Sequence, residues 1–241
     1  MRKLVILKKA EKIIFVGDTH GDLEASQKII ERYLKRGNKI VFLGDYVDRG
    51  PASKENLEFL LKVKETNPNQ VILLQGNHEG YRVLNFSPAD FWESLTPEEE
   101  RKYASLVEKL PLVVVAGPII ALHGALPEVK SLKEIEQVEL GDKRWLEIVW
   151  GDFQEEEGGF LGMNPLTGRP EFGKDWFEKI MRRLKKKVLI RSHQPNAPRF
   201  MFEKRCLTLF TSSAYGRERE IAIFDFEKEI NTAKDLEIVR I

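Results

Sequence analysis

The sequence predicts an α/β fold built on mixed β-sheets. Short, fully apolar runs at residues 13–16, 40–43 and 71–74 alternate with segments of helical periodicity in the first half of the chain. Such runs are typical of strands in a sheet that is covered on both faces. In the second half, two apolar runs flank Gly117-Pro118, as in a hairpin. We see no linker-like segment and no repeat of fixed period, so we expect one domain over residues 1–241.

The helices of the first half follow the first two strands. Residues 22–36 carry apolar side chains at helical spacing and stop before Gly37-Asn38, which is typical of a helix end. Residues 53–64 show the same spacing, with Ser53 as the expected N-cap. Alternating strands and helices of this kind favour an α/β class of fold.

The second half is predicted to contain shorter elements. The segment 154–173 is rich in glycine and acidic residues, and we expect it to be a loop. The apolar patterns predict helices at 97–109 and 175–185, strands at 113–116, 119–122 and 188–190, and three further strands near 207–211, 221–226 and 236–241.

Charge and cysteine content argue against several classes of protein. The chain has 39 basic and 38 acidic residues, a net charge of +1, so we do not expect a nucleic-acid partner. The single cysteine excludes a disulfide framework and a cysteine-rich zinc site. A cysteine-based phosphatase needs an arginine six positions after its nucleophile, and Ser212 stands at that distance from Cys206.

The apolar runs also bear on membranes. The longest apolar stretch, residues 112–122, contains Pro118 and is too short to span a bilayer. The apolar run at residues 4–7 is far shorter than a secretory core. We therefore expect a cytoplasmic protein that does not bind membranes.

Four apolar runs end in polar clusters that contain glycine. Sites in α/β sheets gather at the carboxyl ends of strands, where glycine lets the backbone turn sharply and approach a ligand. An isolated Gly-Asp is usually a turn, but a turn requires neither Asp-x-His nor Asp-x-x-Asp-Arg. The clusters are Gly17-Asp18-Thr19-His20-Gly21-Asp22, Gly44-Asp45-Tyr46-Val47-Asp48-Arg49-Gly50, Gln75-Gly76-Asn77-His78-Glu79 and His123-Gly124.

The four histidines of the chain point to a metal site. His20, His78 and His123 lie in these clusters, and His193 lies just after the strand at 188–190. Histidine, aspartate and asparagine without thiolate suit manganese, iron or zinc. A carboxylate can bridge two such cations. Between cations about 3.5–4 Å apart, water loses a proton near neutral pH and can attack phosphorus in line.

In these motifs the sequence resembles the phosphoprotein phosphatase family of metallophosphoesterases, and most closely a minimal prokaryotic or archaeal serine/threonine protein phosphatase. The resemblance spans about residues 13–224. It implies the calcineurin-like fold, with two mixed β-sheets packed as a sandwich and flanked by helices. Beyond the first three clusters, the similar blocks are Leu110-Pro111-Leu112, His123-Gly124-Ala125-Leu126, Trp150-Gly151-Asp152, Gly168-Arg169 with Phe172-Gly173, Arg191-Ser192-His193-Gln194 and residues 209–215.

The resemblance implies a centre of two divalent cations, with manganese expected and iron or zinc as alternatives. One cation is implied to bind Asp18 and His20, and Asp45 is implied to bridge both. The ligands implied for the second cation are Asn77, His123 and His193.

The resemblance also implies roles in catalysis and phosphate binding. His78 is similar to the family's general acid, and Asp48 is implied to pair with it. Such a pairing fixes the imidazole tautomer and keeps the imidazole protonated for the leaving alkoxide. Arg49 and Arg169 are implied to clamp phosphate oxygens by paired hydrogen bonds, with Tyr215 over the site.

The expected function is hydrolysis of phosphoserine and phosphothreonine in proteins by a metal-bridging hydroxide. A symmetrical diadenosine tetraphosphate hydrolase or a broad phosphatase or phosphodiesterase would share the first three motifs. The later blocks, Trp150-Gly151-Asp152, Arg169 and residues 209–215, favour the protein phosphatase. A non-catalytic scaffold is expected to lose ligands, and every ligand position here is filled. The oligomeric state stays open.

Overall fold

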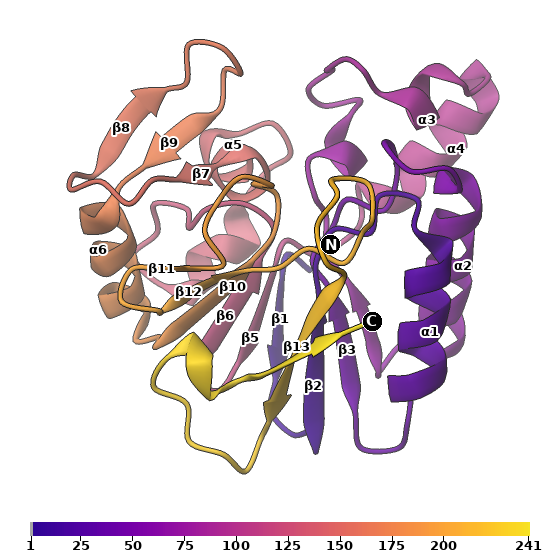
Figure 1. Ribbon diagram of the computed structural model, residues 1–241. Coiled ribbons are helices and arrows are strands. Elements are labelled where there is room, and N and C mark those ends of the chain that lie inside the picture. The colour runs from indigo at the N-terminus through magenta and orange to yellow at the C-terminus, as the bar shows by residue number, and fades with distance from the viewer. Residues whose placement is uncertain (1) are drawn as a thin grey trace.

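Two β-sheets pack face to face at the centre of the molecule, with helices on the outer face of each (Figure 1). The computed structural model describes residues 2–241. One sheet has six strands in the order β1 (Leu4–Leu7), β5 (Val113–Ala116), β6 (Ile119–Leu122), β10 (Val188–Arg191), β12 (Cys206–Thr208) and β11 (Phe200–Met201). The other has five, in the order β14 (Glu237–Arg240), β13 (Glu220–Asp225), β2 (Lys12–Val16), β3 (Lys39–Phe42) and β4 (Val71–Leu73).

Both sheets are mixed, as predicted. In the six-stranded sheet β10 is parallel to β6 and to β12, whereas β5 and β6 form the antiparallel hairpin that Gly117-Pro118 predicts. In the five-stranded sheet β2, β3 and β4 are parallel, and β13 runs antiparallel to β2. The expected sandwich of two mixed sheets flanked by helices is therefore confirmed.

The apolar runs of the sequence bury both faces of their strands. Along β2, Ile13 and Phe15 belong to the core between the two sheets, whereas Ile14 and Val16 face the helices. This alternation follows from the two-residue period of a strand. A strand with both faces buried has no polar positions, which is why these runs are uniformly apolar.

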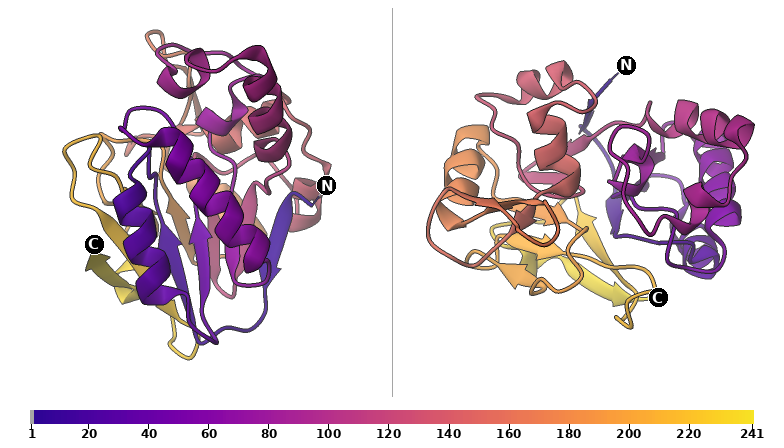
Figure 2. Two further views of the ribbon diagram at one scale, coloured as in Figure 1. Left: turned by 90° about the vertical axis from the view of Figure 1, so that its right-hand side faces the viewer. Right: turned by 90° about the horizontal axis from the view of Figure 1, so that it is seen from above.

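Helices complete the outer layers. α1 (Leu23–Tyr33), α2 (Ser53–Thr66) and α4 (Pro97–Val107) pack on the five-stranded sheet (Figure 2, left). α5 (Lys143–Trp150) and α6 (Lys174–Leu184) pack on the six-stranded sheet. Single turns or short helices lie at η1 (His78–Gly80), α3 (Asp90–Glu93), η2 (Leu132–Gln137) and η3 (Ala233–Asp235). Within residues 2–241, none of the helices has the length and apolar character needed to cross a membrane.

The prediction of a loop over residues 154–173 is wrong. This segment contains β8 (Phe160–Met163) and β9 (Pro170–Phe172), which form a three-stranded sheet with β7 (Asp152–Phe153). The antiparallel pair of β8 and β9 stands above the six-stranded sheet at the upper left of Figure 1. Its strands escape detection because Phe160, Leu161 and Met163 are exposed and follow no alternating pattern.

Ser53 is not the N-cap of its helix, contrary to the prediction. It is the first helical residue, Ala52 stands at the cap, and no side chain of residues 2–241 caps this end. The Ser53 hydroxyl instead accepts a hydrogen bond from the backbone N–H of Asp48 at 2.9 Å. The serine therefore supports the polar loop after β3 rather than the helix.

β1 and α5 are among the elements that were not predicted from the sequence. β1 is a four-residue strand that pairs in parallel with β5, and an isolated run of this length carries little periodicity. α5 spans only eight residues and buries Trp145 and Trp150. The three last strands do form, within a few residues of the predicted ranges, as β12, β13 and β14.

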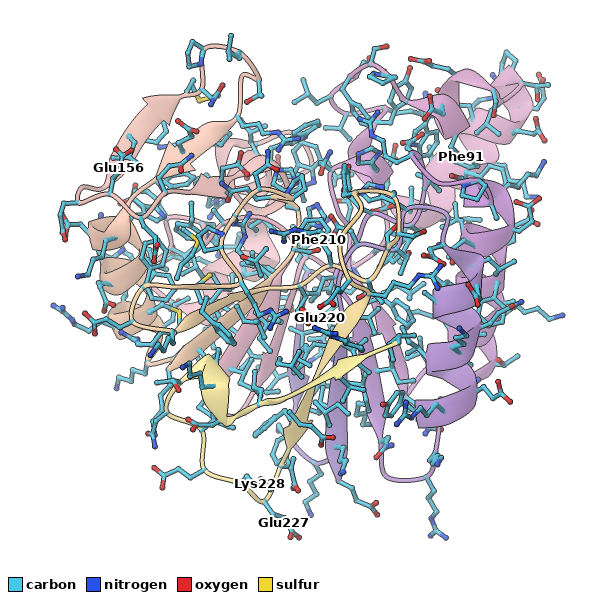
Figure 3. The ribbon with its side chains drawn as sticks, in the orientation of Figure 1. Phe91, Glu156, Phe210, Glu220, Glu227 and Lys228 are labelled. Carbon is cyan, nitrogen blue, oxygen red and sulfur yellow. The ribbon has the colours of Figure 1, made fainter. Side chains whose placement is uncertain are left out.

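The topology places the polar clusters at one end of the sandwich. An isolated parallel bridge joins Asp18, just after β2, to Phe210, just after β12. Figure 3 shows Phe210 near the middle of the molecule, whereas Glu227 and Lys228 lie at the far end of the sheets. The carboxyl ends of strands from both sheets thus meet in one place.

The N-terminus of α4 provides a test of local stability. Thr96 accepts a hydrogen bond from the Glu99 N–H at 3.3 Å, and the Glu99 carboxylate accepts one from the Thr96 N–H at 3.1 Å. We expect Thr96→Ala to lower the free energy of unfolding by about 0.5–2 kcal/mol in urea titrations, because one helix N–H loses its acceptor. Thr96→Ser retains the hydroxyl and should stay near wild type. Equal stability of the two variants would contradict this assignment.

Candidate metal centre

Five strands deliver buried donor side chains to one point. Asp18 follows β2, Asp45 follows β3, Asn77 follows β4, His123 follows β6 and His193 follows β10. All five side chains are at most 4% exposed, as are those of His20 and His78. Asp45 and His193 adopt positive φ angles of 53° and 70°. These sharp turns direct the side chains inward instead of along the strands.

The first donor cluster consists of His20, Asp45 and His78, each of which offers a ligand atom within 4.8 Å of the others. His20 Nε2 lies 3.6 Å from Asp45 Oδ2 and 3.7 Å from Asp18 Oδ2. The other ring nitrogen, His20 Nδ1, donates to the Val47 carbonyl at 2.9 Å. The Nε2 lone pair is therefore free to face the carboxylates.

The second donor cluster consists of Asp45, His123 and His193, again within 4.8 Å. His123 Nε2 lies 3.3 Å from Asp45 Oδ2 and 3.0 Å from Asn77 Oδ1. His193 Nδ1 lies 2.8 Å from the same Asn77 oxygen. His123 Nδ1 faces the Leu43 carbonyl at 3.0 Å, so Nε2 is the atom turned to the cluster. Asn77, which follows β4, completes this group because its Oδ1 contacts both histidines.

The donors fit a pair of divalent cations. Asp45 is shared by the two clusters, as a bridging carboxylate would be. Asp18 Oδ1 is buried without a hydrogen-bond partner among residues 2–241, and buried polar atoms are rarely left unpaired. Oxygen and imidazole donors without thiolate are those that hard or borderline cations prefer. Bound cations would supply partners for these atoms.

Burial and neighbouring charges shift the pKa values of the donors in opposite directions. Burial lowers the pKa of His20 to about 4 and holds that of His193 well below its usual range. Burial also lowers the pKa of His123, but Asp45 and Asp18 outweigh it and raise the value to about 9. Burial raises the pKa of Asp18 to about 7. Burial by itself would raise the pKa of Asp45, but the neighbouring His123 and His78 hold it well below its usual range.

His78 differs from the other histidines because a carboxylate takes its second nitrogen. His78 Nδ1 and Asp48 Oδ2 form a short hydrogen bond, and Asp48 Oδ1 accepts from the Phe91 N–H at 2.7 Å. Burial lowers the pKa of His78, but Asp45 and Asp48 outweigh it and raise the pKa above the ordinary value. The Nε2 of His78 lies 3.8 Å from Asp45 Oδ2. Asp48 thus fixes the ring within the first cluster, and the raised pKa favours its protonated form.

The three side chains expected to contact phosphate surround the clusters. Tyr215 Oη lies 3.4 Å from His20 Nε2, and burial raises the pKa of Tyr215 to about 12. Arg49 is exposed beside it, on a backbone with φ 70°. Arg169 Nη1 lies 3.6 Å from Asp152 Oδ2, with its guanidinium 5.6 Å from the Trp150 ring centre. Arg169 is therefore tied to the rim near the second cluster.

Glu79 has a part in the site that the sequence reasoning did not assign. Its Oε2 accepts from the N–H groups of Asp45 at 2.8 Å and Gly76 at 2.9 Å, and its Oε1 accepts from the Tyr46 N–H at 2.9 Å. This buried carboxylate joins the loops that follow β3 and β4. Its place directly after His78 in the third polar cluster was the available signal.

Replacing Glu79 should loosen both loops. In Glu79→Gln one carboxylate oxygen becomes an amide donor, which leaves a buried N–H without an acceptor. We expect the free energy of unfolding to fall by about 1–3 kcal/mol in urea titrations. Glu58→Gln is the matched control, since within the described part of the chain the exposed Glu58 carboxylate accepts only from the Tyr103 hydroxyl. Equal losses in the two variants would show that Glu79 does not hold the loops.

The high pKa of His123 predicts a proton release on metal binding. With a pKa of about 9, His123 is protonated at pH 7 in the metal-free protein, and a cation requires the neutral imidazole. We expect Mn²⁺ binding to release about one proton from His123 at pH 7, less as the pH rises toward 9. Calorimetric titrations in two buffers of different ionisation enthalpy measure this. Heats that do not depend on the buffer would contradict it.

The fold and the clustered donors together define a metal-dependent phosphoesterase domain. The chain belongs to the calcineurin-like phosphoesterase family, whose sequence profile matches residues 11–197. This match and the similarities reported next confirm the resemblance drawn from the motifs.

The chain is similar to several known proteins. Serine/threonine-protein phosphatase rdgC of Drosophila melanogaster is 29% identical over 238 residues, which cover 86% of this chain and 36% of that protein. The chain spans 36% to 47% of the length of the first curated relatives that it matches.

Two solved structures show the same fold. A Saccharomyces cerevisiae protein serine/threonine phosphatase, described as similar to human phosphatase PP5, has a TM-score of 0.82 at 23% identity and covers 99% of this chain and 83% of that one. A structure described provisionally as a diadenosine tetraphosphatase has a TM-score of 0.61 at 17% identity, covering 100% and 98%.

Proposed function

We propose that this chain hydrolyses phosphoserine and phosphothreonine in proteins with two divalent cations, manganese being the expected pair. The observation that carries the proposal is the shared Asp45 carboxylate: it belongs to both buried donor clusters and lies beside the paired His78 and Asp48. This arrangement joins a site for two cations to a proton donor. Together they suit the cleavage of a phosphate monoester with a poor leaving group.

In this proposal Asp18, His20 and Asp45 hold one cation. The residues that hold the other are Asp45, Asn77, His123 and His193. When bound, the cations would act as Lewis acids and would lower the pKa of water to supply the nucleophile. The chain's own contribution is to fix the donors before binding: His20 and His123 each have one ring nitrogen committed to a backbone carbonyl. This leaves the opposite nitrogen of each ring turned to the cluster.

His78 is the proposed general acid. Asp48 holds its Nδ1, so the Nε2–H is directed toward Asp45, and the raised pKa favours the protonated imidazole. A serine or threonine alkoxide leaves readily only when it receives a proton, and His78 Nε2 can donate it. Phe91 and Trp92 fix this pair, because the N–H of Phe91 binds Asp48 and the indole N–H of Trp92 binds the His78 carbonyl.

Arg49, Arg169 and Tyr215 are the proposed contacts to the phosphoryl oxygens. Arginine binds phosphate with two parallel hydrogen bonds, which orient it as well as attract it. The three residues approach from different segments: the loop after β3, the turn between β8 and β9, and the segment after β12. Because the pKa of Tyr215 is raised to about 12, its hydroxyl stays protonated and can donate.

The proposal of a protein substrate rests on similarity and on the later sequence blocks. The relatives named serine/threonine-protein phosphatase align with most of this chain. The fold of the yeast protein phosphatase also agrees more closely, with a TM-score of 0.82 against 0.61 for the provisional diadenosine tetraphosphatase. A symmetrical diadenosine tetraphosphate hydrolase is the second candidate, because the structure described provisionally as a diadenosine tetraphosphatase aligns with the whole of this chain.

Two substitutions separate proton donation from metal binding. We expect His78→Asn to reduce kcat by about 10²–10⁴-fold on a phosphothreonine peptide while metal content stays at the wild-type value. Asp45→Asn should lose metal and activity together, because the carboxylate is shared by both clusters. Elemental analysis and steady-state kinetics measure the two effects. A His78→Asn variant with wild-type rates would refute the general-acid role.

The substrate class is tested by a direct comparison. We expect kcat/KM in manganese buffer to be much larger for a phosphothreonine peptide than for diadenosine tetraphosphate. The peptide presents one phosphomonoester and needs protonation of its leaving group, which the pairing of His78 and Asp48 provides. A preference for the dinucleotide would be compatible with the proposed metal centre, but it would contradict the proposed protein substrate and favour the second candidate.

A further inference from the structure

His193 faces two polar groups through its two ring nitrogens. On one side Nδ1 lies 2.8 Å from Asn77 Oδ1 and 3.2 Å from His123 Nε2, within the second donor cluster. On the other side Nε2 lies 3.5 Å from Asp152 Oδ1. A neutral imidazole offers a lone pair on one nitrogen and a proton on the other. The group that faces Nε2 therefore controls whether Nδ1 is available to a cation.

Asp152 and His193 each present a buried atom with no partner of its own. Within residues 2–241, His193 Nε2 and Asp152 Oδ1 are both buried and make no hydrogen bond, although they face each other. The 3.5 Å that separates them is slightly longer than a good hydrogen bond. A small rotation of the His193 ring would satisfy both atoms at once. The two unpaired atoms are thus a possible donor, His193 Nε2–H, and a possible acceptor, Asp152 Oδ1, of one hydrogen bond.

Asp152 is held in place on its remaining sides. Its Oδ2 lies 3.6 Å from Arg169 Nη1, and its Oδ1 lies 3.8 Å from Nη2 of the fully buried Arg191. Gln194 binds the adjacent backbone in both directions, since it accepts from the Phe153 N–H and donates to the Phe153 carbonyl, each at 3.1 Å. β7 is therefore fixed against the segment that carries His193.

We propose that Asp152 is a positioning residue that accepts the Nε2 proton of His193 and so presents the Nδ1 lone pair to the second donor cluster. A carboxylate behind a metal-binding histidine fixes the ring's tautomer and orientation and strengthens the ligand. Asp152 lies in β7, outside both donor clusters, and orients His193 from there. Its other oxygen, Oδ2, faces Arg169. The proposal rests on the assignment of His193 as a metal ligand in the proposed function.

The test uses the metal-free full chain and its titration with Mn²⁺. We expect Asp152→Asn to weaken binding at one of two sites by about 10–100-fold, the range typical of such outer partners. Glu171→Gln is the matched control: Glu171 is the strand neighbour of Asp152, and among residues 2–241 its carboxylate accepts hydrogen bonds only from Gln154 and Asn164. The control should bind Mn²⁺ like the wild type. Equal weakening in both variants would overturn the proposal, because loss of a nearby charge would then suffice.

A second readout reports the tautomer directly. The chain has only four histidines, so nitrogen-15 NMR of the labelled rings can be assigned with single His variants. Asn77 Oδ1, 2.8 Å from Nδ1, favours the Nδ1–H tautomer of metal-free His193, whereas Asp152 favours the Nε2–H tautomer. We expect the Nε2–H fraction to be larger in the wild type than in Asp152→Ala. If Asp152→Ala does not fold, because Arg191 then lacks a counter-charge, Asp152→Asn with its reduced Mn²⁺ affinity remains decisive. An unchanged tautomer in a folded Asp152→Ala would overturn the proposal.

His193→Ala separates this proposal from the proposed function. If His193→Ala loses one Mn²⁺ site whereas Asp152→Asn and Asp152→Ala bind like the wild type, His193 is a ligand and Asp152 does not position it. If His193→Ala itself keeps both sites, the ligand assignment fails, and the positioning role fails with it.

Discussion

The apolar interface between the two sheets is the constraint on which the rest of the structure depends. The donor clusters draw Asp18, Asp45 and Asn77 from the five-stranded sheet, and His123 and His193 from the six-stranded one. Burial of the facing apolar surfaces holds the two sheets face to face, so the backbone N–H of His193 reaches Asp18 Oδ2 at 3.2 Å. Neither sheet alone could assemble the second cluster.

A centre of this kind requires the fold to bury charges, which is costly unless each charge has partners. The structure meets this cost with fixed local contacts. Glu79 binds three backbone N–H groups of the loops after β3 and β4, and Asp48 binds the N–H of Phe91 as well as His78. The contacts orient the carboxylates and imidazoles before a cation or substrate arrives. Stability and function therefore draw on the same hydrogen bonds.

The rim around the centre is built differently from its base. The base consists of turns that follow buried strands, whereas Arg169 comes from the turn between β8 and β9 of the small sheet, and Tyr215 from an irregular segment. The base could be predicted, because apolar runs followed by Asp, Asn or His are visible in the sequence. The strands of the small sheet could not, because β8 is exposed and its Phe160 and Met163 show no alternating pattern.

The sequence by itself determined the α/β class with mixed sheets, the strands that carry the polar clusters and the residue types able to hold a metal. These features are local: a strand buried on both faces must be apolar, and ligand chemistry resides in the side chain. Only the tertiary structure established that Ser53 supports the Asp48 loop, that Glu79 joins two loops, and that Asp152 lies behind His193. Such pairings join residues distant along the chain. Their distances depend on how the two sheets and the small third sheet pack, which no local pattern encodes.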